Sequence, residues 1–221
     1  MSASTMRHLV VKDLYLFRSM SLGGIIGGLT AAAMMTGSAL PINAGGLLFI
    51  CTLVVLNIFL AMAAVQERKE HMALFMLSLP ISPVQYVTAK AIATLIAFGV
   101  PWLLLTATVA VAVHVSPMPN GFLPFWMAVQ AYQFLYFGVL CAVGLNTDST
   151  GWHATAITAG NISVNFVIMA LFTWPALMAD AGGPTAVWHE AVLGLIAVAL
   201  VGGLVAIGLG IAVYARRTHY L

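Results

Sequence analysis

The stretch of sequence that decides the fold is residues 66–90, QERKEHMALFMLSLPISPVQYVTAK. Four charged residues, Glu67, Arg68, Lys69 and Glu70, stand near its start, and long apolar runs lie on both sides of it. A charged side chain at the centre of a bilayer costs about 2.5–3.5 kcal/mol on insertion scales. The charged segment therefore stays outside the membrane, while the apolar runs before and after it can cross.

The composition of the chain is that of a protein whose solvent is lipid. Hydrophobic residues make up 62% of the 221 residues and charged residues only 6%, whereas soluble domains are about 25% charged. A membrane span needs about 20 apolar residues, so about six helices and short loops use up the length. The apolar runs are continuous and lack the alternation of β-barrel strands. We therefore predict an all-α integral membrane protein.

Proline, glycine and polar clusters divide the apolar sequence into six predicted spans within a single transmembrane domain, residues 1–221. An N-terminal amphipathic helix on the cytoplasmic side is expected to precede the first span. Residues 66–86 form a cytoplasmic segment between the second and third spans. The six spans are expected at about 22–40, 47–65, 87–113, 122–145, 154–178 and 188–215.

The basic residues predict the orientation. With six spans, all eight Lys and Arg residues fall on one side of the membrane, and such residues accumulate on the cytoplasmic side. Both termini and the 66–86 segment are therefore expected in the cytoplasm. The net charge of +2 and the lack of a basic tract argue against nucleic-acid binding. The eight residues are Arg7, Lys12, Arg18, Arg68, Lys69, Lys90, Arg216 and Arg217.

The 66–86 segment is expected to fold into a short helix that packs on another surface. Residues 72–79 are rich in Met, Leu and Phe, and Pro80 and Pro83 then end the helix and turn the chain back to the membrane. Together with the charged collar, this helix makes a small projection below the bilayer. The alternative is an interfacial loop with solvated charges.

These features resemble the type-2 ABC transporter permeases, which are bacterial exporters with six spans per half. The resemblance rests on a charged collar after the second span, a Leu-rich helix, a Leu-Pro-Ile-Ser turn and a Lys that opens the third span. Residues 9–16 also look like the N-terminal cytoplasmic helix of such permeases. The matching residues are Glu67, Arg68, Lys69, Glu70, the Leu74–Leu79 helix, Leu79-Pro80-Ile81-Ser82 and Lys90.

The resemblance implies that residues from about His71 to Ser82 dock on a separate ATPase subunit and transmit its motion. ATP and Mg would then bind to that partner, and this chain would hold no cofactor. The resemblance also implies a second permease subunit, in a homodimer or a heterodimer, with substrate passing between the two. The ATPase-coupling residues would be Glu67, Arg68, Lys69, Glu70, His71, Leu74, Phe75, Leu79, Pro80 and Ser82.

The N-terminal helix carries Lys12, Asp13 and Arg18 among apolar residues. On a helical wheel at about 100° per residue, Asp13 falls inside the apolar face, where a lone charge is unfavourable. One interpretation is an ion pair with a basic group of the 66–86 segment or of the ATPase. The other is that the carboxylate reaches the lipid headgroups from a helix end.

Amides and glycines mark the helix interfaces. The amides need hydrogen-bond partners in lipid, so they either join helices or line a substrate path. Glycines four apart in the first span, and glycines and alanines at the same spacing in the sixth, let helices approach closely, within one subunit or across a dimer. The amides inside predicted spans are Asn57, Gln130, Gln133, Asn161 and Asn165, of which the last four are possible substrate-path residues.

Several kinds of chemistry find no support in the sequence. No GxxxxGK[ST] motif is present to bind ATP, and no HExxH motif or pair of intramembrane aspartates indicates a protease. All acidic residues lie at span ends or outside, whereas a proton-driven carrier keeps an ionisable group at mid-membrane. Cys51 is expected near the outer face of the membrane and Cys141 near the inner face. This separation is too large for a disulfide, so both are expected to be free, packed thiols. His114 and His189 form a weak haem or metal ligand set.

We therefore expect a multi-pass permease subunit of an ATP-driven exporter in the bacterial cytoplasmic (inner) membrane, surrounded by lipid. One alternative is the permease of a haem exporter used in cytochrome c maturation. Another is a membrane assembly subunit that transports nothing. An apolar interior fits lipids, peptides or drugs equally.

Only about residues 179–187 are free between the last two spans, which leaves little room for an extracellular element.

Overall fold

The computed structural model describes residues 3–36, 46, 48–58, 82–115, 118–147 and 149–217, and every regular element within them is helical. Long apolar runs without interior polar breaks favour this outcome, because a helix satisfies its own backbone hydrogen bonds in lipid. The elements are α1 (Ala3–Thr36), the Leu48–Ile58 helix, α4 (Pro83–Val115), η1 (Asn120–Phe122), α5 (Leu123–Asn146), α6 (Thr150–Phe172), α7 (Pro175–Ala181) and α8 (Glu190–Arg217).

Five helices of the described residues are long and apolar enough to cross a membrane, which makes this a multi-pass membrane protein. They overlap five of the six predicted spans. The shorter Leu48–Ile58 helix covers the first part of the predicted second span, whose remaining residues, 59–65, lie outside the described residues. The count of six therefore stays a prediction. The five spans are Met6–Met34, Val84–Val115, Asn120–Asn146, Thr150–Phe172 and Glu190–Arg216.

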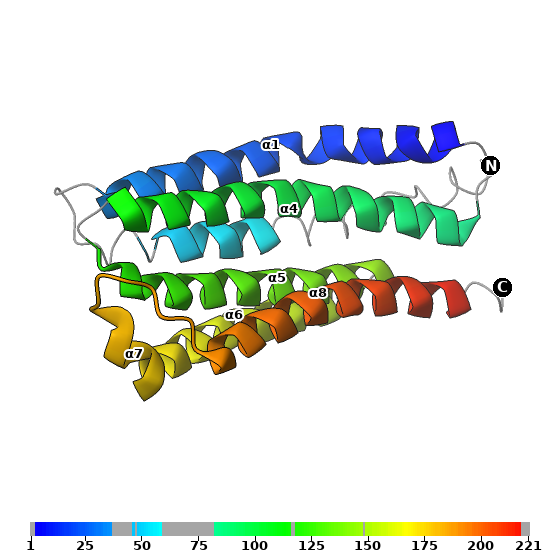
Figure 1. Cartoon of the computed structure of the whole chain (residues 1–221). Helices are drawn as coiled ribbons and strands as arrows, with labels where there is room; N and C mark the ends of the chain where they lie inside the picture. The colour runs from blue at the N-terminus through cyan, green and yellow to red at the C-terminus, as the bar shows by residue number, and fades with distance from the viewer. Residues whose placement is uncertain are drawn as a thin grey trace.

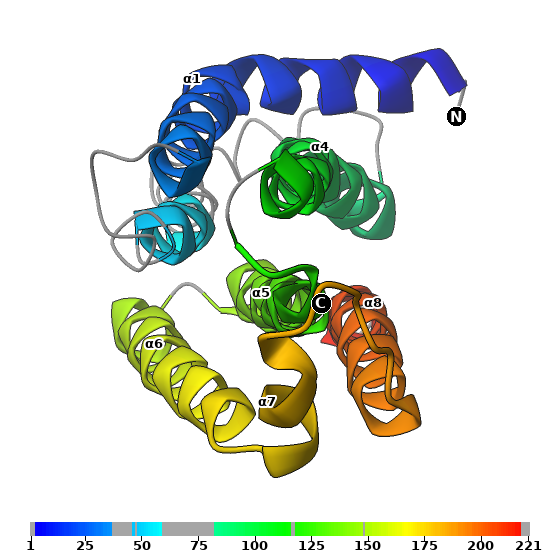
Figure 2. The same cartoon turned by 60° about the vertical axis from the view of Figure 1, so that its left-hand side comes forward.

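The expected N-terminal helix and first span form one continuous helix, α1, of 34 residues. At about 1.5 Å per residue, such a helix is about 50 Å long, which exceeds the roughly 30 Å of hydrocarbon in a bilayer. Figure 2 shows α1 changing direction, so that its darker-blue first part runs across the end of α4. Phe17 is buried in this first part, whereas Arg7 and Leu16 are exposed.

The helices are arranged so that the described basic residues gather at one end of the bundle, which we call the basic end. The start of α1, the start of α4 and the end of α8 lie there, with both chain termini, while α7 lies at the opposite end (Figure 1). The described residues at or near the basic end include Arg7, Lys90 and Arg216. This gathering agrees with the single-sided distribution expected from the sequence.

The parallel helices α1 and α4 pack along much of their length. The Ser21 hydroxyl on α1 donates a 2.8 Å hydrogen bond to the Ala97 carbonyl on α4. About two turns further on, a side chain at Gly28 would collide with Leu105. The two pairs are 76 and 77 residues apart in sequence, so the register of the two helices stays nearly constant between them.

The Ser21 hydrogen bond has a reason in the sequence of α4. Pro101 lies inside this helix and has no N–H group with which to bond the carbonyl four residues earlier, which is that of Ala97. An unpaired carbonyl in a membrane costs free energy unless another group satisfies it. Ser21 supplies the missing donor from the neighbouring helix, so α4 continues through Pro101.

A second close pair is formed by α5 and α8, which also run in the same direction (Figure 1). A side chain at Gly138 would collide with the backbone of Gly203, and one at Gly210 would approach the backbone of Ala142 at 2.9 Å. The glycines of the sixth span therefore allow close approach within the subunit. Their lack of side chains brings the two backbones together, as small residues do in membrane proteins.

The end of the bundle opposite the termini is closed by a short hydrogen-bonded cap. The Gly121 N–H donates to the Gly183 carbonyl at 3.0 Å, and the Asn120 amide donates to the Pro184 carbonyl at 2.9 Å. The fifth span ends at Phe172 and not near 178, because Pro175 begins a new helix, α7. The connecting segment is thus 173–189, longer than the expected 179–187, and it holds a helix of seven residues.

Candidate functional site

Most of the predicted ATPase-coupling residues lie outside the part of the chain that the structure describes. Of the predicted set, Ser82 is described, at the start of α4. The segment that contains the others joins the Leu48–Ile58 helix to α4. The residues outside the described ranges are Glu67, Arg68, Lys69, Glu70, His71, Leu74, Phe75, Leu79 and Pro80.

Ser82 and Gln85 fix the first turn of α4. The Ser82 hydroxyl accepts from the Gln85 N–H at 3.3 Å, and the Gln85 side-chain oxygen accepts from the Ser82 N–H at 3.2 Å. This reciprocal pair is a capping box, and Pro83 occupies the first helical position, where its missing N–H costs nothing. The residues Ser82-Pro83-Val84-Gln85 are a sequence signal for this helix start. Pro83 is predicted above only as a turn residue, and the capping box is not among the predictions.

Two charged residues near the basic end are buried between helices. Asp13 on α1 is 3% exposed and Lys90 on α4 is 1% exposed. The Asp13 carboxylate lies 3.2 Å from the ammonium group of Lys12, whose side chain is half exposed. Arg18 points elsewhere and stacks its guanidinium group 3.7 Å from the centre of the Tyr15 ring. Asp13 is thus embedded in protein and does not reach out to lipid headgroups, whereas its ion pair with a basic group of the 66–86 segment or of the ATPase stays a prediction.

Three of the buried amides meet where the Leu48–Ile58 helix packs on α5. The Asn57 amide donates to the Gln133 side-chain oxygen at 3.3 Å, across 76 residues of sequence. Gln130 lies one turn earlier than Gln133 on the same face of α5 and is 1% exposed. Its backbone carbonyl accepts a 2.9 Å hydrogen bond from the indole of Trp102 on α4. Uncharged polar groups thus gather inside the bundle.

The other two predicted path residues lie on α6, away from this cluster. Asn161 accepts a hydrogen bond from the Tyr136 hydroxyl at 3.3 Å. Asn165 is exposed and donates to the Asn161 carbonyl within its own helix at 2.8 Å. The four predicted path residues therefore form no common lining: Gln130 and Gln133 lie inside the bundle, and Asn165 faces outward.

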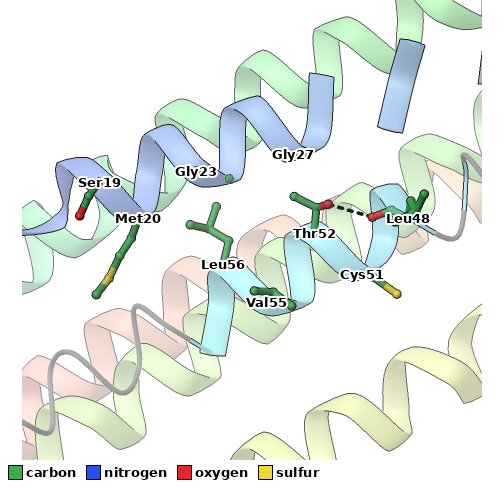
Figure 3. A pocket seen from close by; sticks show the side chains of 10 residues that line it. Ser19, Met20, Gly23, Gly27, Leu48, Cys51, Thr52, Val55 and Leu56 are labelled. Atoms are coloured by element: carbon green, nitrogen blue, oxygen red, sulfur yellow. Dashed lines mark hydrogen bonds between the residues drawn. The ribbon is translucent and has the colours of Figure 1, made fainter. Parts of the chain in front are cut away.

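An apolar groove of about 600 Å³ lies between α1 and the Leu48–Ile58 helix. Figure 3 shows Leu56 and Thr52 reaching toward α1 and Cys51 pointing away from it. Cys51 is exposed and Cys141 is buried, and both are free. The prediction of two free thiols agrees with the structure. The prediction that Cys51 is packed is wrong, because its side chain lies on the outward face of this helix.

The described residues hold no group of three or more His, Cys, Asp or Glu side chains that could bind a metal ion. His189 is engaged with Asp180, whose carboxylate lies 2.9 Å from its imidazole. His114 is exposed at the end of α4. The part of the chain that the structure describes therefore gives these two histidines no third ligand with which to hold a metal.

The comparisons with known proteins assign the family. A family model described as ABC-2 family transporter protein matches residues 8–214, from the first part of α1 to the last turns of α8. No curated protein and no solved structure is similar enough to this chain to count as a match. The family match extends over nearly all of the chain and agrees with the resemblance found in the coupling segment. The chain therefore belongs to the ABC-2 family of transporter proteins, the type-2 ABC permeases.

Proposed function

We propose that this chain is the membrane-spanning subunit of an exporter driven by an ATPase on a separate chain. The observation that carries the proposal is the family match over residues 8–214. It is supported by the absence of a P-loop motif anywhere in the 221 residues, because a chain that cannot cradle ATP needs a partner to use it. ATP and Mg belong to that partner.

The coupling site of the proposal is the segment from His71 to Ser82, and the basic end, where α4 begins, is then the cytoplasmic side. What supports this choice is the helix that follows. The capping box of Ser82 and Gln85 fixes the first turn of α4, and α4 packs on α1 and α5 further along. A displacement applied to the segment would therefore move a rigid helix and not a loose connection.

Substrate passes between two permease subunits in this proposal, as a homodimer or a heterodimer, in the cytoplasmic membrane of a bacterium. The haem-exporter alternative gains nothing from His189, because this residue already pairs with Asp180. The remaining alternative is an assembly subunit that transports nothing. The experiment below distinguishes it from a permease, because an assembly subunit needs no ATPase coupling.

The first prediction is that Phe75→Ala combined with Leu79→Ala releases or uncouples the ATPase while the spans still fold. The two side chains are four apart in the sequence, so that in the expected short helix they share one face. Truncating a buried interface anchor commonly costs about 2 kcal/mol or more, which is roughly a thirtyfold loss of affinity. The measurement is co-purification of an ATPase with the chain in mild detergent, followed by substrate-stimulated ATP hydrolysis.

A matched control replaces two apolar residues at the opposite end, Val187→Ala with Trp188→Ala, which are 39% and 41% exposed. Met118 and Asn120 are unsuitable for this control, because Met118 is buried and Asn120 bonds the Pro184 carbonyl. The control should keep its ATPase bound and stimulated. A docking variant that keeps both properties would show that force enters the permease elsewhere. A wild-type chain that never co-purifies with an ATPase would favour the assembly subunit.

A further inference from the structure

The amide cluster inside the bundle contains more hydrogen-bonding capacity than the protein uses. Asn57, Gln130 and Gln133 are each at most 1% exposed, and Trp126 is 5% exposed. Among them, five buried polar atoms have no hydrogen-bond partner in the part of the chain that the structure describes. They are Asn57 Oδ1, Trp126 Nε1, Gln130 Oε1, Gln130 Nε2 and Gln133 Nε2.

These groups face one interface. Trp126, Gln130 and Gln133 are spaced by four and three residues along α5 and so lie on one side of it. Trp126 contacts the start of the neighbouring helix, with its ring centroid 6.5 Å from that of Phe49. Gln133 bonds Asn57 near the other end of that helix. Gln130 is therefore held between these two points, inside the packed interface.

The cluster is mixed in its hydrogen bonding and carries no charge. The indole N–H and the two glutamine amides are donors, and the Asn57 and Gln130 oxygens are acceptors. Neither the Leu48–Ile58 helix nor α5 contains an Asp, Glu, Lys or Arg residue. An anion would leave the acceptors unmatched and a cation would leave the donors unmatched. A neutral group that both donates and accepts would match both.

We propose that Asn57, Trp126, Gln130 and Gln133 form an internal binding site for an uncharged group that donates and accepts hydrogen bonds, supplied by water or by a small amide. Polar side chains buried at membrane depth that lack protein partners are otherwise costly. The inference rests on the proposed permease function and deepens it, because it gives the apolar interior a polar site. Its test uses this chain alone, so that a failed ATPase experiment and a failed site are distinguishable.

The test is hydroxyl-radical footprinting of the full chain in detergent, in which radicals formed from bound water oxidise adjacent side chains. Trp126 should be oxidised in the wild-type chain in spite of its burial. Combining Asn57→Leu, Gln130→Met and Gln133→Met keeps the shape of the side chains and should reduce oxidation of Trp126 by roughly threefold or more, since the site then no longer holds a polar occupant. Trp152, which is 66% exposed, serves as the dose reference and should not change.

A second variant keeps the test decisive if the triple variant fails to fold. Gln130→Met removes two of the unmatched atoms and leaves the bond from Trp102 intact, since that bond ends on the backbone of Gln130. In an empty site this substitution removes a penalty and should raise the melting temperature by about 2–4 °C or more. In an occupied site the melting temperature should stay the same or fall, because the substitution removes bonds to the occupant.

Two probes distinguish the sources of the group. N-acetyl-phenylalaninamide offers amide donors and acceptors, and the matched N-acetyl-phenylalanine methyl ester lacks the terminal amide N–H groups. Protection of Trp126 by the amide alone assigns the site to a small amide. Oxidation that neither probe changes assigns it to water. Oxidation of Trp126 equal in the wild type and the variants, or a raised melting temperature of Gln130→Met, would overturn the proposal.

Discussion

Asp13 and Lys90 are charged, yet each is almost completely buried, and they lie on neighbouring parallel helices. Where α1 and α4 run side by side, each residue of α1 lies opposite the α4 residue 76 or 77 positions later. Ser21 bonds Ala97, and Gly28 meets Leu105, which are offsets of 76 and 77 residues. The same offset counted from Asp13 reaches positions 89 and 90. Buried charges are stable in proteins only when they are paired and hydrogen-bonded.

We therefore predict that Asp13 and Lys90 are energetically coupled. Asp13→Asn and Lys90→Met should each destabilise the chain by about 3–5 kcal/mol, because breaking a buried charge pair at one end commonly costs that much. The double variant should cost clearly less than the sum of the two. The measurement is the unfolding free energy or the melting temperature in detergent, as a double-mutant cycle.

Lys12 provides the matched control for this cycle. It also approaches Asp13, but its side chain is 46% exposed, and exposed ion pairs contribute only about 0–1 kcal/mol. Lys12→Met should therefore have a small effect. Strict additivity of Asp13→Asn and Lys90→Met would mean that each residue has a different partner.

The sequence could predict that Asp13 lies on the apolar face of a helix, because helical periodicity is local. It could not name the neighbour of Asp13, because the pairing depends on the register of two helices that are far apart in sequence. The same holds for Asn57 and Gln133. Both were expected to need partners in the membrane, but only the packing of the Leu48–Ile58 helix on α5 joins them.

At the scale of single elements, α4 depends on a hydroxyl from α1. We predict that Ser21→Ala destabilises the wild-type chain by about 0.6–1.7 kcal/mol, the range of hydrogen bonds between membrane helices. In a Pro101→Ala background the same substitution should cost less, because the alanine introduced at position 101 has an N–H that bonds the Ala97 carbonyl within the helix. A double-mutant cycle on melting temperature measures the difference.

The exposed Thr30 on α1 provides a comparison, because its hydroxyl bonds the Ile26 carbonyl of its own helix. Thr30→Ala should cost the same in both backgrounds. If Ser21→Ala destabilises the chain equally with and without Pro101, the serine does not replace the hydrogen bond to the Ala97 carbonyl that Pro101 cannot make. The sequence placed a proline inside the span correctly, but which side chain would satisfy Ala97 was again a matter of register.

The pairing of α5 and α8 gives a second prediction at this scale. Gly203→Leu should destabilise or unfold the subunit, because a side chain there would meet Phe134 and its carbonyl at 2.8–3.0 Å. Overpacking costs about 1–3 kcal/mol even where side chains can adjust. The control is Gly208→Leu on the same helix, where nothing lies within 4 Å. Size-exclusion profiles and thermal denaturation distinguish the two variants. Equal stability of both would mean that α5 and α8 do not pack closely.

At the scale of the whole molecule, the single-sided placement of basic residues predicts which end faces the cytoplasm. In a chain with Cys51 and Cys141 replaced by serine and alanine, Thr185→Cys should react with an impermeant thiol reagent in intact cells. Lys69→Cys and Thr218→Cys should not. Thr185 is an exposed residue of the cap, which makes it a better reporter than the hydrogen-bonded Asn120. Labelling of Lys69→Cys in sealed cells would reverse the orientation.

The helical class and the approximate spans could be predicted from the sequence, because the length and polarity of apolar runs are local properties. The cap could not. The run from Phe172 to Met178 is mostly apolar, and its division between α6 and α7 follows from Pro175. The capping box at Ser82 was available from the sequence, whereas the unmatched atoms around Gln130 become visible only when the helices are packed together.

The parallel pairing of α1 with α4 also has a consequence for biosynthesis. Ser21 leaves the ribosome 76 residues before Ala97, and translation adds about 5–20 residues per second. The first helix therefore waits roughly 4–15 s in the membrane before its partner exists. During that interval Asp13 and the glycine face of α1 cannot yet contact α4. Assembly factors that shield polar groups in nascent helices would act on this chain in that interval.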